Sequence, residues 1–239
     1  AAQVAKLDEI RQTVVATSQV PLYVNDPVAV TAEGTPVRIV RNAETNLGDL
    51  CADAYRALSN ADIAFVNGGG IRKQIEAGDI TLDDIYSVHP FGNTMCVIRV
   101  TGQQVLDALE WGARAVPSEN GGFLQVSGLT YEIHTGVASS AEKDENGMFT
   151  RVSGEYRVKN VMVGGQPLEL DKTYTLASHN YMLLGHGDGY TMFDGCEVLG
   201  EDMMVDNQVL ITYITTTLGG VVGEQYANPY GDGRIVAVE

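Results

Sequence analysis

The stretch that decides the fold is residues 46–72, which read NLGDLCADAYRALSNADIAFVNGGGIR. Apolar residues recur at three- and four-residue steps from Leu47 to Leu58, so a helix that buries one face is expected, with Asn46 as its candidate N-cap. Residues 61–66 form a short apolar run that predicts a buried strand. Because this run leads directly into NGGGIR, a glycine-rich loop is expected where the strand ends.

Helices and strands are interleaved along the rest of the chain without strict alternation. The expected helical segments are an apolar stripe at Val4, Leu7, Ile10 and Val14, a helix from Thr101-Gly102 to Val116, and a last helix capped by Asp206. The expected extended segments are residues 21–36, 94–100, 124–133, 156–163, 167–170, 174–178 and 233–238, with a hairpin turn at Gly164-Gly165 and a polar excursion at 139–148. This order favours an α+β fold with mixed β-sheets and packed helices over a doubly wound sheet.

The length of 239 residues fits one compact domain. Residues 1–20 are expected to be a remnant of an interdomain helix and linker, and residues 21–239 the domain itself. The first ten residues, AAQVAKLDEI, contain neither a basic region nor an apolar run, so no signal peptide is expected there. Two explanations remain open, a cytosolic protein or a piece of a longer chain.

Charge excludes one class of partner. Fifteen Lys and Arg against 31 Asp and Glu give a net charge of −16, which repels nucleic acids at long range. An anionic ligand must therefore be bound by a few well-placed arginines. No window reaches the roughly 18 uninterrupted apolar residues of a membrane helix, so no membrane insertion is expected.

The motifs of several catalytic and metal sites are missing. The sequence contains no GxSxG, HExxH, Walker A loop, Asp-x-His or Gly-Asn-His motif, and its four histidines are scattered. Cys51, Cys96 and Cys196 lie far apart without a CxxC pair, which argues against a zinc site and a disulfide framework. We therefore predict no catalytic residue, bound metal or cofactor in this chain, which indicates a binding domain or one half of an enzyme.

Loops rich in glycine carry the candidate binding residues. In NGGGIR, Asn67 and Gly69 lie where the backbone can approach a ligand and expose N–H groups, and Arg72 can bind a phosphate or carboxylate. The alternative is a tight turn with a surface arginine. In HPFGN, Phe91 can stack on a planar base and Asn93 can bind its edge, unless the ring merely anchors the loop.

Further candidates lie near the end of the chain and before the helix. Tyr181 supplies a second aromatic ring, and Asp188, between two glycines, can accept hydrogen bonds from vicinal hydroxyls unless it is an ordinary Asp-Gly turn. Arg41 can reach an anion or can pair with a carboxylate. Together the candidate residues match the groups of a nucleoside that carries a phosphate.

The motifs together resemble a known family. ETNLGDL at 44–50, NGGGIR at 67–72, GDI at 78–80, PFGN at 90–93, VTG at 100–102, FLQVSGL at 123–129 and GDGY at 187–190 occur in this order. On these residues the chain resembles the C-terminal domain of the 5′-nucleotidase family, which includes UDP-sugar hydrolases and 2′,3′-cyclic-nucleotide phosphodiesterases.

The resemblance implies a division of labour. An N-terminal metallophosphatase domain, absent from this chain, is expected to hold two divalent metal ions and to perform hydrolysis, while the C-terminal domain binds the nucleotide. Arg41 and Arg72 are then expected at the phosphate, and Asn67 and Asn93 near the base and ribose. The resemblance also implies that Phe91 forms one wall of an aromatic clamp and that Asp188 binds the ribose.

Departures from the family pattern concern the loop before Asp188. Tyr181 precedes Asp188 by seven residues where the family's second clamp aromatic precedes it by six, so either Tyr181 or Met182 forms that wall. His186 replaces a glycine, so the loop is expected to be reshaped or His186 to contact the ligand. Arg38 is a candidate substitute for a second family arginine that aligns with Val37.

Three functions are compatible with these residues. The first is the substrate-recognition domain of a 5′-nucleotidase-type hydrolase located in the periplasm, secreted or attached to the cell wall, with its signal on the missing N-terminal part. The second is a non-catalytic module that has lost nucleotide affinity. The third is a hydrolase of the same architecture that acts on a non-nucleotide ester such as a sulfur-carrier conjugate.

Overall fold

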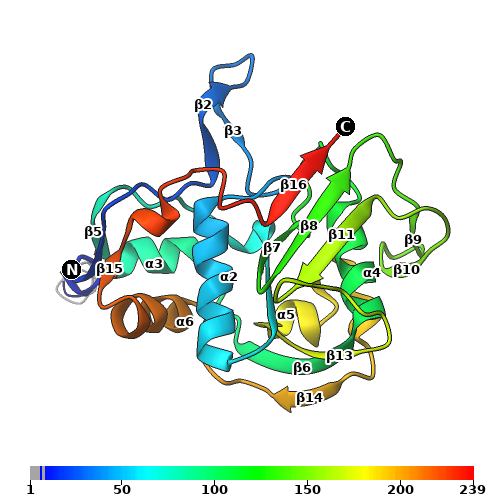
Figure 1. Cartoon of the computed structure of the whole chain (residues 1–239). Helices are drawn as coiled ribbons and strands as arrows, with labels where there is room; N and C mark the ends of the chain where they lie inside the picture. The colour runs from blue at the N-terminus through cyan, green and yellow to red at the C-terminus, as the bar shows by residue number, and fades with distance from the viewer. Residues whose placement is uncertain (1–5, 7–8) are drawn as a thin grey trace.

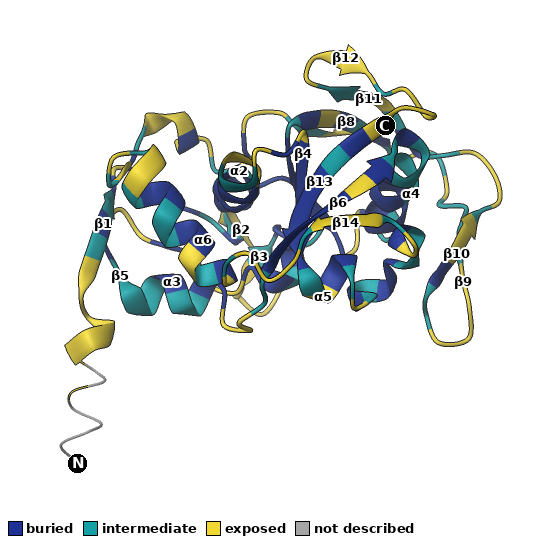
Figure 2. Ribbon diagram, turned by 90° about the horizontal axis from the view of Figure 1, so that it is seen from below, coloured by how far each residue is buried: buried dark blue, intermediate teal, exposed yellow. Residues whose placement is uncertain are grey.

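The computed structural model describes residue 6 and residues 9–239 and confirms the predicted α+β fold. Its centre is a five-stranded mixed sheet in the order β14-β6-β13-β4-β7; Figure 1 labels all of these strands except β4, which is labelled in Figure 2. These strands are β4 (Ile63–Asn67), β6 (Met95–Thr101), β7 (Leu124–Ser127), β13 (Thr173–His179) and β14 (Glu197–Gly200). β13 runs parallel to β4, and the other neighbours are antiparallel.

Helices cover both faces of this sheet. Figure 2 shows α2 (Asn46–Ser59), α3 (Leu82–Val88) and α6 (Asp206–Thr212) on one side and α4 (Gly102–Ala113) with α5 (Asn180–Leu183) on the other. Successive residues of a strand point to opposite faces, so Ala64 and Val66 join one hydrophobic core while Ile63 and Phe65 join the other. This explains why the strand predicted at 61–66 is apolar at nearly every position.

Smaller sheets surround this centre. The second sheet contains β8 (Leu129–His134), β11 (Val158–Val163), β12 (Gln166–Pro167) and β16 (Ile235–Val238), and the third contains β1 (Val14–Ser18), β5 (Gly78–Thr81) and β15 (Val221–Val222). Two separate hairpins are β2 (Asn25–Val30) with β3 (Pro36–Arg38) and β9 (Ala141–Lys143) with β10 (Phe149–Val152). The predicted turn at Gly164-Gly165 is confirmed, since Val163 pairs with Gln166.

Some expected elements differ from the structure. Residues 124–133 form two strands, because the chain bends at Gly128 (φ 82°) so tightly that a Cβ there would lie 2.1 Å from the carbonyl oxygen of Asp62. Val14 lies in β1 instead of a helix, while Val4 and Leu7 lie outside the described residues. The predicted domain boundary after residue 20 stays a prediction.

Two helix caps also differ. Thr45, and not Asn46, caps α2, because its hydroxyl accepts a hydrogen bond from the N–H of Gly48 at 3.0 Å. The side-chain amide of Asn46 instead accepts a hydrogen bond from the N–H of Tyr23 and donates one to the carbonyl of Tyr226. Asp206 is the first residue of α6 and not its N-cap.

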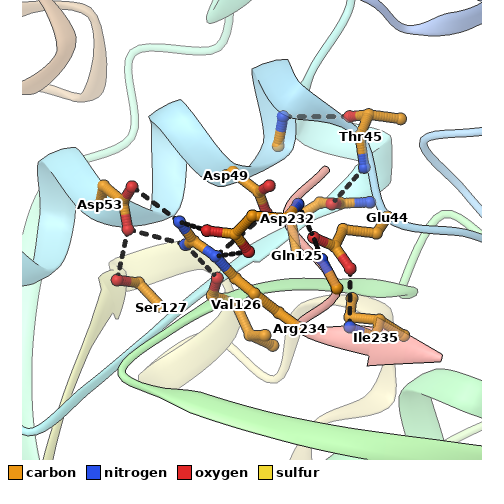
Figure 3. Close-up of polar contacts among 12 residues, drawn as sticks. Glu44, Thr45, Asp49, Asp53, Gln125, Val126, Ser127, Asp232, Arg234 and Ile235 are labelled. Carbon is orange, nitrogen blue, oxygen red and sulfur yellow. Dashed lines mark hydrogen bonds and ion pairs between the residues drawn. The ribbon is translucent and has the colours of Figure 1, made fainter. Parts of the chain in front are cut away.

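The C-terminal segment is bound to α2 by a cluster of charged residues (Figure 3). Arg234 donates to both carboxylate oxygens of Asp53, at 2.7 and 2.9 Å, and also pairs with Asp49 and Asp232. The carboxylate of Glu44 accepts hydrogen bonds from three backbone N–H groups between residues 232 and 235. Burial raises the pKa of Asp49, although Arg234 acts in the opposite direction.

Candidate functional site

One pocket contains most of the residues singled out from the sequence. Its volume is about 370 Å³, and seven of the eight predicted residues line it. The lining residues are Arg41, Asn67, Gly69, Gly70, Phe91, Asn93, Gly121, Tyr181 and Asp188. The eighth, Arg72, lies beside the pocket, where it donates to the carbonyl of Gly69 at 3.4 Å and its guanidinium carbon is 5.9 Å from the centre of the Phe91 ring.

The glycine-rich loop allows this convergence by close backbone packing. A Cβ on Gly68 would lie 2.1 Å from the carbonyl oxygen of Val40, and one on Gly69 would lie 2.9 Å from that of Gly121. The expectation that this loop exposes its N–H groups is wrong for two residues. Gly68 donates to Phe123 and Gly69 donates to Gly121. These bonds hold the loop against residues 121–123, and the neighbouring Asn120 donates to the carbonyl of Arg41 at 2.9 Å.

Asp188 is fixed from several sides. Its carboxylate accepts hydrogen bonds from the side-chain amide of Asn67 at 2.6 Å and from the hydroxyl of Tyr181 at 3.2 Å. The indole N–H of Trp111 donates to its carbonyl at 2.9 Å. Asp188 has a positive φ of 55°, which Asp tolerates better than most residues. The carboxylate is thus held in one orientation while it lines the pocket.

Two exposed aromatic rings contribute to the pocket walls. Phe91 is 61% exposed and Tyr181 is 44% exposed, so both rings present apolar surface at the pocket. Of the two residues considered for the second aromatic wall, only Tyr181 lines the pocket, because Met182 is fully buried in the core. Burial raises the pKa of Tyr181, and the neighbouring Asp188 charge raises it further.

Arg41 provides positive charge. Its Nε atom is buried and has no hydrogen-bond partner among the described residues. Burial lowers the pKa of Arg41, and the charges of Arg38 and Arg72 lower it further, while the carboxylates of Glu119 and Asp188 act in the opposite direction. Three guanidinium groups thus share one neighbourhood in a chain whose net charge is −16. An anion bound there would relieve both the desolvation and the mutual repulsion.

Neighbouring residues hold the loops that carry these side chains. Gln125 donates to the carbonyls of Val40 and Ala43, which fixes the turn around Arg41. The backbone N–H of Asn93 donates to the carboxylate of Asp206, whose pKa burial raises to about 6. Sequence reasoning did not assign these roles, although Gln125 lies in the FLQVSGL motif.

His186 does not line the pocket. Its backbone has a positive φ of 55°, a conformation that favours glycine, although His186 carries a Cβ. Its imidazole pairs with the Asp194 carboxylate. The expected contact between His186 and a ligand is therefore not supported by its position.

Two further features fall outside this pocket. A larger hollow of about 450 Å³ lies near Arg56 and the turn at 164–165 and contains none of the predicted residues. Glu44, Asp49 and Asp232 have carboxylate oxygens within 4.8 Å of one another. Because the Arg234 guanidinium already pairs with two of these residues, this group does not fit a metal ion.

Among the described residues, no helix combines the length and apolarity needed to cross a membrane.

Comparison with known proteins identifies the family of this fold. The family model for the 5′-nucleotidase C-terminal domain matches residues 14–195. The chain is 36% identical over 203 residues, 83% of its length, to the trifunctional nucleotide phosphoesterase protein YfkN of Bacillus subtilis, and 34% identical over 176 residues, 74% of its length, to a 5′-nucleotidase of Vibrio cholerae. The chain therefore belongs to the 5′-nucleotidase C-terminal domain family, which confirms the resemblance.

A solved structure gives the same result. The 5′-nucleotidase precursor of Thermus thermophilus superposes on the whole chain with a TM-score of 0.78 at 30% identity. The chain spans 13% of the Bacillus relative, 28% of the Vibrio relative and 42% of the Thermus chain.

Proposed function

We propose that this chain is the nucleotide-recognition domain of a phosphoester hydrolase of the 5′-nucleotidase type. The proposal rests on one observation: a single pocket brings together two exposed rings, an oriented carboxylate and a guanidinium nitrogen. Among the described residues, that nitrogen has no hydrogen-bond partner. In this arrangement the base stacks between Phe91 and Tyr181, and Asp188 accepts hydrogen bonds from the ribose hydroxyls. Arg41 and Arg72 bind the phosphate, while Asn67 and Asn93 contact the base and ribose.

Hydrolysis belongs to a part of the protein outside this chain. The chain covers less than half of the relatives described above, and its acidic group near Arg234 does not fit a metal ion. We infer that an N-terminal metallophosphatase domain holds two divalent ions, which supply an activated water. This chain positions the nucleotide and neutralises phosphate charge. We also infer a location in the periplasm, outside the cell or on the cell wall.

Titration calorimetry tests the binding part of this proposal. The chain is titrated with AMP, adenosine and ribose 5-phosphate, which separate the contributions of base and phosphate. AMP should bind most tightly, because it alone occupies the aromatic walls and the arginines together. The absence of heat and of any thermal shift with AMP at millimolar concentration would favour the alternative of a module without nucleotide affinity.

The division of labour is tested by activity. The rigorously purified chain should release no phosphate from AMP with Mg²⁺, Mn²⁺, Zn²⁺ or Co²⁺. Turnover that co-purifies with the chain and disappears when Arg41 is replaced by Gln would overturn the assignment of hydrolysis to another domain.

A further inference from the structure

His179 lies beneath the pocket at the end of β13. β13 and β4 are parallel neighbours, so their last residues, His179 and Asn67, meet at the same edge of the sheet. His179 is 3% exposed, and its Nε2 atom lies 2.9 Å from the side-chain oxygen of Asn67. Its ring centre is 5.9 Å from that of Tyr181, and Tyr55 packs edge-on against it at 6.4 Å. This histidine therefore contacts two of the residues that line the pocket.

Hydrogen-bond donors and acceptors fix the protonation of this histidine. The carboxylate of Asp188 only accepts hydrogen bonds, so the amide nitrogen of Asn67 must face it, and the amide oxygen must face His179. The imidazole must then donate from Nε2. Burial lowers the pKa of His179 to about 4, so near neutral pH the ring is neutral and carries one proton. The proton is assigned to Nε2 because that atom faces the accepting oxygen of Asn67, whereas Nδ1 is buried and faces no acceptor side chain among the described residues.

We propose that His179 is a positioning residue, which orients Asn67 through its Nε2–H group and so holds the Asp188 carboxylate in place for ribose hydroxyls. This inference rests on the proposed function. Without the donor at residue 179, the Asn67 amide is free to rotate by a half turn and to present its oxygen to the carboxylate. Asp188 then loses one of the hydrogen bonds that orient it, and ribose recognition weakens more than base stacking does.

Two substitutions at residue 179 separate this role from packing. In His179→Gln the side-chain amide nitrogen reaches about the position of Nε2 and still donates, whereas His179→Leu fills similar space without a donor. Tyr55→Phe is the matched control, since it removes a buried hydroxyl without a partner among the described residues and keeps the ring beside His179. Circular dichroism and the melting temperature show whether each variant is folded.

The probes are adenosine and 2′,3′-dideoxyadenosine, which differ only in the ribose hydroxyls. In calorimetry, His179→Leu should lose about five- to tenfold in affinity for adenosine, the size of one hydrogen bond, and less than about twofold for the dideoxy compound. His179→Gln and Tyr55→Phe should keep the discrimination of the original protein. Equal losses for both probes, or no loss in His179→Leu, would show that His179 is merely structural and overturn the proposal.

A ligand-free measurement covers the case in which His179→Leu fails to fold. Long-range ¹H–¹⁵N spectra of the original protein at pH 7 should show His179 as the neutral Nε2–H tautomer. An Nδ1–H tautomer or an imidazolium ion would overturn the relay, whether or not a nucleoside binds. The expected tautomer in a protein that binds neither nucleoside would instead contradict the proposed function, and with it the ribose part of this inference.

Discussion

Replacing Phe91 by alanine is the perturbation that isolates base stacking. Phe91 is 61% exposed, so its removal leaves both cores intact, and the free energy of unfolding should change by no more than about 1 kcal/mol, the value of its contact with Arg72. An aromatic ring stacked on a base contributes roughly 1–3 kcal/mol. Affinity for adenosine should therefore fall by about 5- to 140-fold, since 1.4 kcal/mol corresponds to a factor of ten.

Arg72 complicates the interpretation of this variant. Its guanidinium lies 5.9 Å from the Phe91 ring centre, and an exposed contact of this kind is worth about 0.5–1 kcal/mol. Removal of the ring also frees Arg72, which would weaken phosphate binding. The comparison of ligands separates the two effects, because stacking is lost equally for adenosine and AMP, whereas a displaced Arg72 affects AMP alone.

The assay is titration calorimetry of both ligands with the original chain, Phe91→Ala and Tyr230→Ala. Tyr230 is 48% exposed and does not line the pocket, so its variant controls for loss of an exposed ring. Unchanged adenosine affinity in Phe91→Ala would refute the reasoning, as would an equal loss in Tyr230→Ala.

Three further predictions concern charge and protonation. Arg41→Gln should lower AMP affinity by roughly 1.5–3 kcal/mol, the range of a hydrogen bond to a charged group, and leave adenosine binding nearly unchanged in the same calorimeter; equal loss for both would remove Arg41 from the phosphate. Arg234→Met should lower the free energy of unfolding in urea by about 3–5 kcal/mol, because Asp49 and Asp53 lose the cation that pairs with them in a largely buried site, and a loss below about 1 kcal/mol would contradict that. The pKa of His179 falls from 6.5 to about 4 on folding, so between these two pH values the unfolded chain binds more protons at this residue than the folded chain does. The stability that the neutral imidazole contributes is therefore lost as the pH falls from 6.5 to 4. His179→Gln should therefore show a shallower loss of stability on acidification, and an unchanged slope would be the contrary result.

The central elements of the fold were predictable because their sequence pattern is local. The helix at 46–59 and the strand at 63–67 follow from apolar spacing alone. The prediction of Asn46 as the N-cap of this helix is wrong. Thr45 and Asn46 are both good capping residues, and the choice between them depends on contacts that Asn46 makes with distant segments. Val14 fits a helical stripe equally well, yet pairing with β5 makes it part of a strand.

The pocket residues were predictable because they coincide with loops that carry polar or aromatic side chains after apolar segments. The residues that hold these loops in place were not predictable, since the hydrogen bonds of His179 and Gln125 join segments that are remote in sequence. The same holds for Gly69, whose N–H is satisfied by Gly121 and is not presented to a ligand. Only the three-dimensional arrangement assigns Tyr181, and not Met182, to the pocket.

A crystal structure of the chain soaked with AMP tests most directly whether separate loops form one nucleotide site. The adenine ring should lie between Phe91 and Tyr181, with the ribose hydroxyls on Asp188 and the phosphate against Arg41. AMP bound in the hollow near Arg56, with the pocket of the two rings empty, would contradict the account.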